Sequence, residues 1–141
     1  MNNLQAAFNT AVPGIIMNLK KRNIEALYYE NSTAMVEDIL TKIPAGSSVS
    51  WGGSESLREC GLMDAIKDGS YTLIDRTAAK NPEEKQELYG KAVMADFYLM
   101  STNAITYEGE LINIDGVGNR LACLMHGPKE VFIIIGMNKF V

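Results

Sequence analysis

The stretch that decides the fold is Ser48-Val49-Ser50-Trp51-Gly52-Gly53-Ser54, at residues 48–54. Residues 48–51 form a compact strand pattern that ends at two glycines, where the backbone is free to turn. Ser54 is suited to cap a helix that begins directly after the turn. A strand that leads through a glycine turn into a helix is the first half of a βαβ unit. We therefore expect a parallel sheet.

The rest of the chain repeats this alternation. Further strands are expected at residues 71–74, 97–100 and 131–135, with helices between them. Residues 97–100 are continuously apolar, which is typical of a strand buried on both faces. The predicted fold class is α/β, a mostly parallel sheet with helices on both faces and right-handed crossovers.

Two regions lie outside this alternation. Apolar residues at helical spacing predict an N-terminal helix that kinks or restarts at Pro13-Gly14, and residues 25–29 are expected to form a short strand. Residues 104–106 and 111–114 flank Glu108-Gly109, which can supply the turn of a β-hairpin. We therefore expect a hairpin added to the parallel sheet.

The composition indicates one globular domain over residues 1–141. Hydrophobic residues make up 47% of the chain and charged residues 21%. The net charge of −4 argues against a nucleic-acid partner. No segment approaches the roughly 18 consecutive apolar residues of a membrane span, and no signal peptide is recognisable. We expect a cytoplasmic protein.

Metal-ligating residues are few. The chain has two cysteines, Cys60 and Cys123, and one histidine, His126. These are too few for an iron–sulfur cluster or a zinc site within one chain. We expect two reduced thiols, no metal and no cofactor in this chain.

Ligands of parallel α/β sheets bind beyond the carboxyl ends of the strands. Gly52, Gly53 and Ser54 follow one expected strand, and Thr102 and Asn103 follow another shortly after its end. The glycines permit close backbone approach, and the helix start presents unpaired N–H groups to an anion. The alternative is that this turn only punctuates the structure.

A glycine-rich loop at residues 115–120 is the third candidate segment. Gly116 and Gly118 free its backbone, Asn119 can donate and accept hydrogen bonds, and the Arg120 guanidinium suits a carboxylate or phosphate. The alternative is that Asp115 pairs with Arg120 and merely locks the loop. The spacing matches neither the dinucleotide fingerprint nor the P-loop.

Several ordered motifs resemble those of the LUD domain family of lactate utilization proteins. The longest is Gly109-Glu110-Leu111-Ile112-Asn113-Ile114-Asp115-Gly116-Val117-Gly118-Asn119-Arg120. The others are Trp51-Gly52-Gly53-Ser54, Leu73-Ile74-Asp75-Arg76, Ala95-Asp96, Ser101 through Thr106, Gly127-Pro128-Lys129 and Val131 through Lys139. Together they cover nearly the whole chain.

This resemblance implies the Rossmann-like fold, with an added hairpin, of glucosamine-phosphate deaminases, ribose-phosphate isomerases and CoA transferases. It also implies a role in bacterial L-lactate oxidation beside an iron–sulfur oxidoreductase, so that any cluster belongs to a partner subunit. Family members usually continue past the point where this sequence stops, at Val141. We therefore expect a C-terminally truncated domain whose exposed sheet edge favours a homodimer.

Three functions follow from these patterns. The first is a subunit that binds a small carboxylate or phosphate and supports lactate oxidation, with Arg120 holding the anion and Asn103 and Asn119 orienting it. The second is a free-standing isomerase or CoA-transferase-like enzyme that uses Asp115 or Glu110 as base or nucleophile. The third is a non-catalytic interaction module of a redox complex.

Overall fold

The computed structural model describes residues 2–141, and their contacts group into two compact units. The smaller unit contains residues 2–30, 102–114 and 135–141. The larger unit contains residues 31–101 and 115–134. The expectation of one domain over residues 1–141 stays a prediction.

The larger unit is built on a four-stranded, fully parallel sheet in the order β2-β1-β3-β6. The strands are β1 (Ser48–Trp51), β2 (Thr72–Ile74), β3 (Phe97–Met100) and β6 (Glu130–Ile133). The predicted strands at 48–51, 97–100 and 131–135 therefore share one sheet, although the last ends two residues earlier than expected. The α/β prediction is confirmed.

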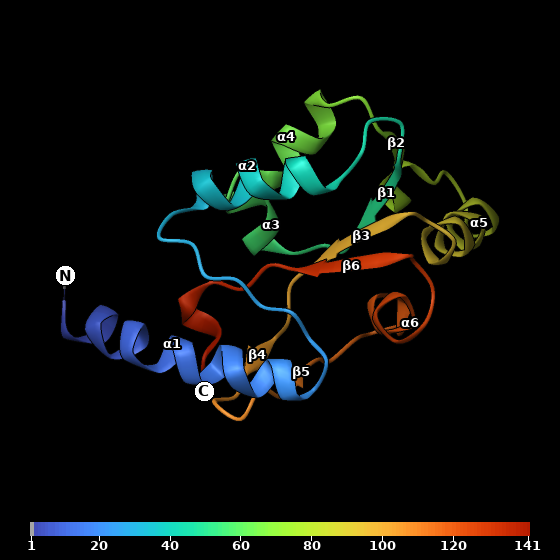
Figure 1. The fold of residues 1–141 in the computed structure, drawn as a ribbon. Helices are drawn as coiled ribbons and strands as arrows, with labels where there is room; N and C mark the ends of the chain where they lie inside the picture. Colours follow the sequence, from blue (N-terminus) through green and yellow to red (C-terminus); the bar gives the residue numbers. More distant parts are fainter. Residues whose placement is uncertain (1) are drawn as a thin grey trace. The chain divides into compact units, whose positions relative to one another are not determined.

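Helices cover both faces of this sheet (Figure 1). Helices α2 (Ser32–Lys42), α3 (Glu55–Glu59) and α4 (Leu62–Asp68) lie on one face, and α5 (Pro82–Val93) and α6 (Asn119–Met125) lie on the other. After β1 the chain continues to β2, which lies on one side of the β1–β3 pair. After β3 it continues to β6, which lies on the other side. The point where the strand order reverses, at which such folds bind ligands, is therefore between β1 and β3.

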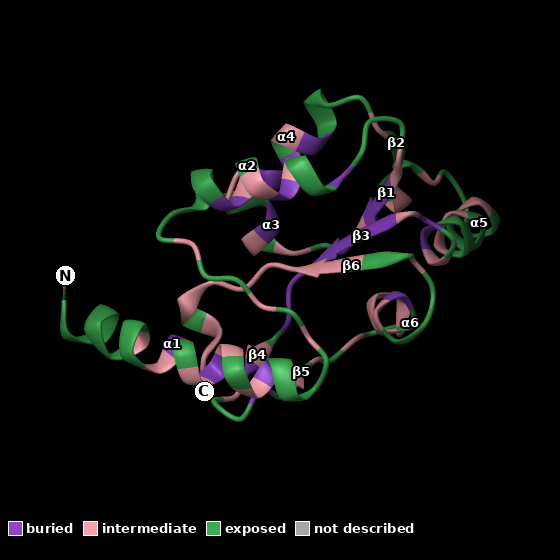
Figure 2. Cartoon of the chain, viewed as in Figure 1, coloured by how far each residue is buried: buried purple, intermediate pink, exposed green. Residues whose placement is uncertain are grey.

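Burial follows the strand order (Figure 2). All four residues of β3 are buried, as is the middle of β1, whereas the edge strands β2 and β6 are partly exposed. At the amino ends, the Asp96 carboxylate accepts hydrogen bonds from the backbone N–H of Ser48 at 2.9 Å and from its hydroxyl at 3.2 Å. Lys129, before β6, forms an ion pair with Asp96 at 2.8 Å. One carboxylate thus joins the starts of three adjacent strands.

The smaller unit contains α1 (Asn3–Lys21) and an antiparallel hairpin of β4 (Ala104–Ile105) and β5 (Leu111–Ile112). The hairpin turns at Glu108-Gly109 as expected, and Gly109 has a φ of 84°. Ile15 and Leu19 of α1 pack with Ile105 in the core of this unit. The 3₁₀ turn η2 (Met137–Lys139) lies in the same unit.

Two local predictions in this unit are wrong. The first helix does not restart at Pro13, because α1 runs unbroken through it, and the alternative of a kink at Pro13-Gly14 stays a prediction. Proline removes one hydrogen bond from a helix interior, and packing of the following turns against the hairpin offsets that loss. Residues 25–29 form no strand either. Leu27 and Tyr28 are exposed, and no other strand among residues 2–141 pairs with the segment.

Within residues 2–141, no helix is both long enough and apolar enough to cross a membrane. No three His, Cys, Asp or Glu side chains of the same residues lie close enough together to hold a metal ion. Cys60 and Cys123 are both free thiols.

Candidate ligand-binding site

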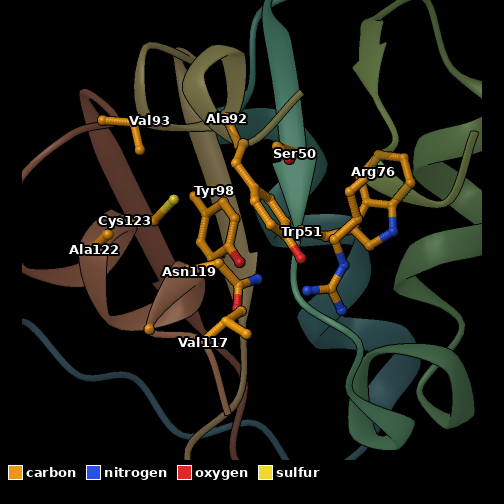
Figure 3. A pocket seen from close by; sticks show the side chains of 12 residues that line it. Ser50, Trp51, Arg76, Ala92, Val93, Tyr98, Val117, Asn119, Ala122 and Cys123 are labelled. Carbon is orange, nitrogen blue, oxygen red and sulfur yellow. The ribbon is translucent and has the colours of Figure 1, made fainter. Parts of the chain in front are cut away.

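A cavity of about 330 Å³ lies between the sheet and the helices α5 and α6 (Figure 3). It is partly open to solvent and belongs entirely to the larger unit. Residues of β1 and β3 line it, so it adjoins the point where the strand order reverses, and its volume is within the size range of small-molecule sites. The residues that line it are Ser50, Trp51, Arg76, Tyr89, Ala92, Val93, Tyr98, Val117, Gly118, Asn119, Ala122 and Cys123.

Arg76 is the lining residue that carries a formal charge at neutral pH. It begins the 3₁₀ turn η1 (Arg76–Ala78), two residues after the end of β2. Asp75 caps this turn by accepting hydrogen bonds from the backbone N–H of Thr77 at 2.9 Å and from its hydroxyl at 2.6 Å. Asp75 therefore fixes where the Arg76 backbone lies. Within residues 2–141, the Arg76 guanidinium donates to no acceptor and pairs with no carboxylate.

The Tyr98 hydroxyl lies at the same end of the cavity. Tyr98 is only 2% exposed, and its side chain reaches from β3 towards Asn119 and Arg76 (Figure 3). The structure gives this hydroxyl no hydrogen-bond partner within residues 2–141. Burial raises the pKa of Tyr98 well above its usual value, with a smaller contribution from Cys123 in the same direction. The phenol therefore stays protonated at neutral pH and can donate a hydrogen bond into the cavity.

Cys123 also faces the cavity, from α6. Burial raises the pKa of its thiol to about 11. A thiol is nucleophilic only when ionised, so Cys123 acts here as a small apolar wall.

Arg120 is occupied by its own loop. Its Nε donates to Oδ1 of Asp115 at 2.8 Å, and Nη1 donates to the carbonyl of Ser101 at 3.3 Å. The other Asp115 oxygen accepts from the backbone N–H of Leu121 at 2.8 Å. The side chains of Arg120 and Asp115 are 17% and 8% exposed. This pair fixes the start of α6 and is the locking arrangement that the sequence left open.

The glycines of the first predicted segment allow close packing beside the cavity. A Cβ added to Gly53 would lie 2.6 Å from Nη2 of Arg76, so glycine leaves the space that the guanidinium occupies. Gly52 is buried, and a Cβ there would lie 3.4 Å from the Tyr98 hydroxyl. Ser54 precedes α3 at the capping position but makes no capping hydrogen bond with its side chain.

Of the residues predicted in the glycine-rich loop 115–120, some line the cavity and others do not. Gly118 and Asn119 line the cavity, with Gly118 in the left-handed conformation that begins α6. Gly116 is exposed and does not line it.

Thr102 and Asn103 belong to the smaller unit. The Thr102 hydroxyl lies 3.0 Å from the Ile112 carbonyl, and Asn103 Oδ1 accepts from the Ile114 N–H at 3.0 Å. Glu110 also lies in this unit, where its carboxylate accepts from the Thr106 hydroxyl at 3.2 Å. These three side chains stabilise the hairpin and its flanks. Their predicted roles at a ligand site stay predictions.

Sequence reasoning did not select Arg76 or Tyr98 as site residues. Arg76 lies two residues after the end of β2, so the strand-end rule that selected Gly52 could also have selected it. Tyr98 lies inside an apolar run that reads simply as core. That its side chain also lines the cavity depends on how α5 and α6 pack on the sheet, which the apolar run does not indicate.

The comparison with family models gives one match, to the LUD domain, over residues 12–141. Searches of curated proteins and of solved structures returned no significant match to the chain. The matched range contains every strand of the sheet, the hairpin and all the residues that line the cavity. The chain therefore belongs to the LUD domain family, which is named for lactate utilization.

Proposed function

We propose that this chain is a LUD-family subunit that supports bacterial L-lactate utilization by binding a small organic anion in the cavity. The observation that carries the proposal is the Arg76 guanidinium, which borders the cavity without a carboxylate partner within residues 2–141. A guanidinium presents planar donors that match a carboxylate or a phosphate. The cavity also lies where parallel sheets bind ligands.

Neutral donors support the same role. The Tyr98 hydroxyl and the Asn119 side chain border the cavity together with Arg76 (Figure 3). A protonated phenol and an amide can orient an anion that the cation holds, without adding charge. Arg120, which the sequence favoured as the anion ligand, supports the site indirectly in this proposal, because its pair with Asp115 fixes the start of α6.

The cavity favours binding over catalysis by this chain alone. Tyr98 and Cys123 both have raised pKa values, so neither of these two groups acts as a base or nucleophile at neutral pH. Asp115 and Glu110, the predicted alternatives, do not line the cavity. We propose that electron transfer from lactate takes place in an iron–sulfur oxidoreductase partner.

The test combines binding with growth. Isothermal calorimetry should detect L-lactate, pyruvate or inorganic phosphate binding to the wild-type chain, and Arg76→Gln should weaken it about 10-fold or more. A host that carries Arg76→Gln in place of the natural gene should grow poorly on L-lactate and normally on glucose. Lys80→Gln, which removes an exposed cation beyond η1, is the control and should change neither result. Normal growth of the Arg76 variant on lactate would refute the proposal.

A further inference from the structure

The cavity is larger than the three-carbon acids of lactate metabolism. Its volume is about 330 Å³, and it is partly open to solvent. Lactate or pyruvate, held at Arg76, fills only part of this space. A ligand that fills the remainder needs a substituent larger than a methyl group.

The part of the lining away from Arg76 is apolar. Ala92 and Val93 of α5 and Ala122 and Cys123 of α6 supply aliphatic surface and a protonated thiol. Each methylene group that a ligand buries against such a wall tightens binding about fourfold. Lining of this kind favours a ligand with a branched or extended hydrocarbon substituent.

The single positive charge at the Arg76 end of the cavity favours a ligand with one negative charge. Arg76 is the one cation among the lining residues, and Arg120 is neutralised by Asp115. A phosphate monoester carries close to two negative charges at neutral pH, because its second pKa is about 6. A carboxylate carries a single charge and has the planar shape of the guanidinium.

Two neutral donors stand beside that cation. Tyr98 is 2% exposed, its hydroxyl has no partner within residues 2–141, and Figure 3 shows it on the same side as Asn119 and Arg76. A hydroxyl or carbonyl oxygen next to the carboxylate can accept from this phenol. A 2-oxo or 2-hydroxy acid therefore uses all three polar groups together.

We propose that the cavity selects 2-oxo or 2-hydroxy monocarboxylates whose apolar substituent is larger than the methyl group of lactate. Arg76 holds the carboxylate, the Tyr98 hydroxyl donates to the oxygen on the second carbon, and the walls from α5 and α6 contact the hydrocarbon part. This inference rests on the proposed function and narrows its ligand to one chemical class.

The experiment is a titration of the full chain followed by the fluorescence of Trp51, which is the only tryptophan and lines the cavity. The ligands are pyruvate, 2-oxobutanoate and 2-oxo-4-methylpentanoate. The matched controls are 4-methylpentanoate, which lacks the 2-oxygen, the neutral ketone 4-methylpentan-2-one, and 3-methylbutyl phosphate. Affinity should rise about fourfold per methylene along the oxo-acid series. The ketone and the phosphate should bind at least 10-fold more weakly than 2-oxo-4-methylpentanoate.

Two variants probe the two ends of the cavity. Tyr98→Phe should weaken the binding of 2-oxo-4-methylpentanoate about 5- to 10-fold and leave the affinity for 4-methylpentanoate unchanged. Only the first ligand has an oxygen on its second carbon that can accept from the phenol. Ala122→Leu narrows the apolar end from an exposed helix position and should abolish the preference for longer acids while pyruvate still binds. Thermal melts of both variants establish that they are folded.

The outcomes separate this inference from the proposed function. If pyruvate or phosphate binds as tightly as 2-oxo-4-methylpentanoate and Arg76→Gln abolishes that binding, the selection for larger acids is wrong and the anion site stands. If none of the anions binds the wild-type chain, both proposals fail. If Tyr98→Phe weakens both six-carbon acids equally, the role of its hydroxyl is wrong.

Discussion

The Arg76 guanidinium occupies space that is available only because residue 53 has no side chain. A Cβ at position 53 would lie 2.6 Å from Nη2 of Arg76, and this atom is the far end of a flexible side chain. Gly53→Ala should therefore displace the guanidinium while changing the free energy of unfolding by less than about 1 kcal/mol. We expect calorimetry to show anion affinity at least fivefold lower.

Gly90→Ala is the matched control. Gly90 lies in α5 of the same unit, and a Cβ there meets no atom within 4 Å. This variant should gain about 0.5–1 kcal/mol of stability from helix propensity and bind anions normally. Unchanged affinity in Gly53→Ala would show that the position of Arg76 does not determine binding.

Arg120 gives a prediction about stability. Removing its side chain leaves Asp115 without a counter-ion, and both side chains are largely buried. Arg120→Ala should therefore lower the free energy of unfolding by about 2–4 kcal/mol in urea titration, and Arg120→Lys should lower it less. Stability that is unchanged in Arg120→Ala, combined with lost anion affinity, would instead identify Arg120 as a direct ligand.

At the scale of elements, the hairpin turn depends on Gly109. This residue has a φ of 84°, and a Cβ would lie 3.0 Å from the backbone nitrogen of Leu19 in α1. Gly46 has the same φ, but a Cβ there would meet no atom within 4 Å. Gly46→Ala should lower the free energy of unfolding by about 1 kcal/mol, through backbone strain alone. Gly109→Ala should lower it by about 2–3 kcal/mol, because the new Cβ also clashes with the backbone of α1. Equal losses in thermal melts would show that α1 does not pack closely on the turn.

The carboxylate that joins β1, β3 and β6 predicts a dependence on pH. The Lys129 ammonium and the Ser48 backbone N–H and hydroxyl lower the pKa of Asp96 to about 2, from an ordinary 3.8. Because the folded pKa is the lower one, the stabilisation is complete above about pH 4 and disappears as the pH falls towards 2. Lys129 is 79% exposed, so water screens its contribution and the Ser48 bonds matter more.

Asp96→Asn measures this effect. Its melting temperature should be lower than that of the wild type at neutral pH, and the difference should shrink as the pH falls from about 4 to about 2. Lys91→Met, which removes an exposed i,i+4 ion pair with Glu87, should show almost no difference at any pH. A constant difference between wild type and Asp96→Asn over this range would contradict the linkage.

The sequence predicted the elements well where local signals were strong. The alternation of apolar runs with glycine, proline and capping residues indicated β1, β3, β6, α5 and the hairpin correctly. No restart occurs at Pro13, where packing against the hairpin outweighs local preference, and no strand forms at residues 25–29, where no strand among residues 2–141 pairs with the segment. Secondary structure there depends on contacts between segments that are distant in sequence.

At the scale of the whole molecule, the site was only partly predictable. The strand-end rule pointed to the edge of the sheet at which the cavity lies, and Gly118 and Asn119 line this cavity. The availability of a side chain depends on its partners in three dimensions, which the sequence does not reveal. Asp115 occupies Arg120, whereas no carboxylate within residues 2–141 occupies Arg76. Hence the cation that the sequence favoured differs from the one that borders the cavity.

The most direct test of the central claim is a nitrogen–proton NMR titration of the whole chain with 2-oxo-4-methylpentanoate. We predict that the Trp51 indole and Arg76 Nε signals shift most, together with backbone amides near Asn119 and Ala92, and that signals of α1 and the hairpin stay in place. All the shifting groups belong to residues that line the cavity. Shifts centred on the hairpin or the amides of residues 102–114, with Trp51 and Arg76 unchanged, would contradict the assignment of the cavity as the anion site.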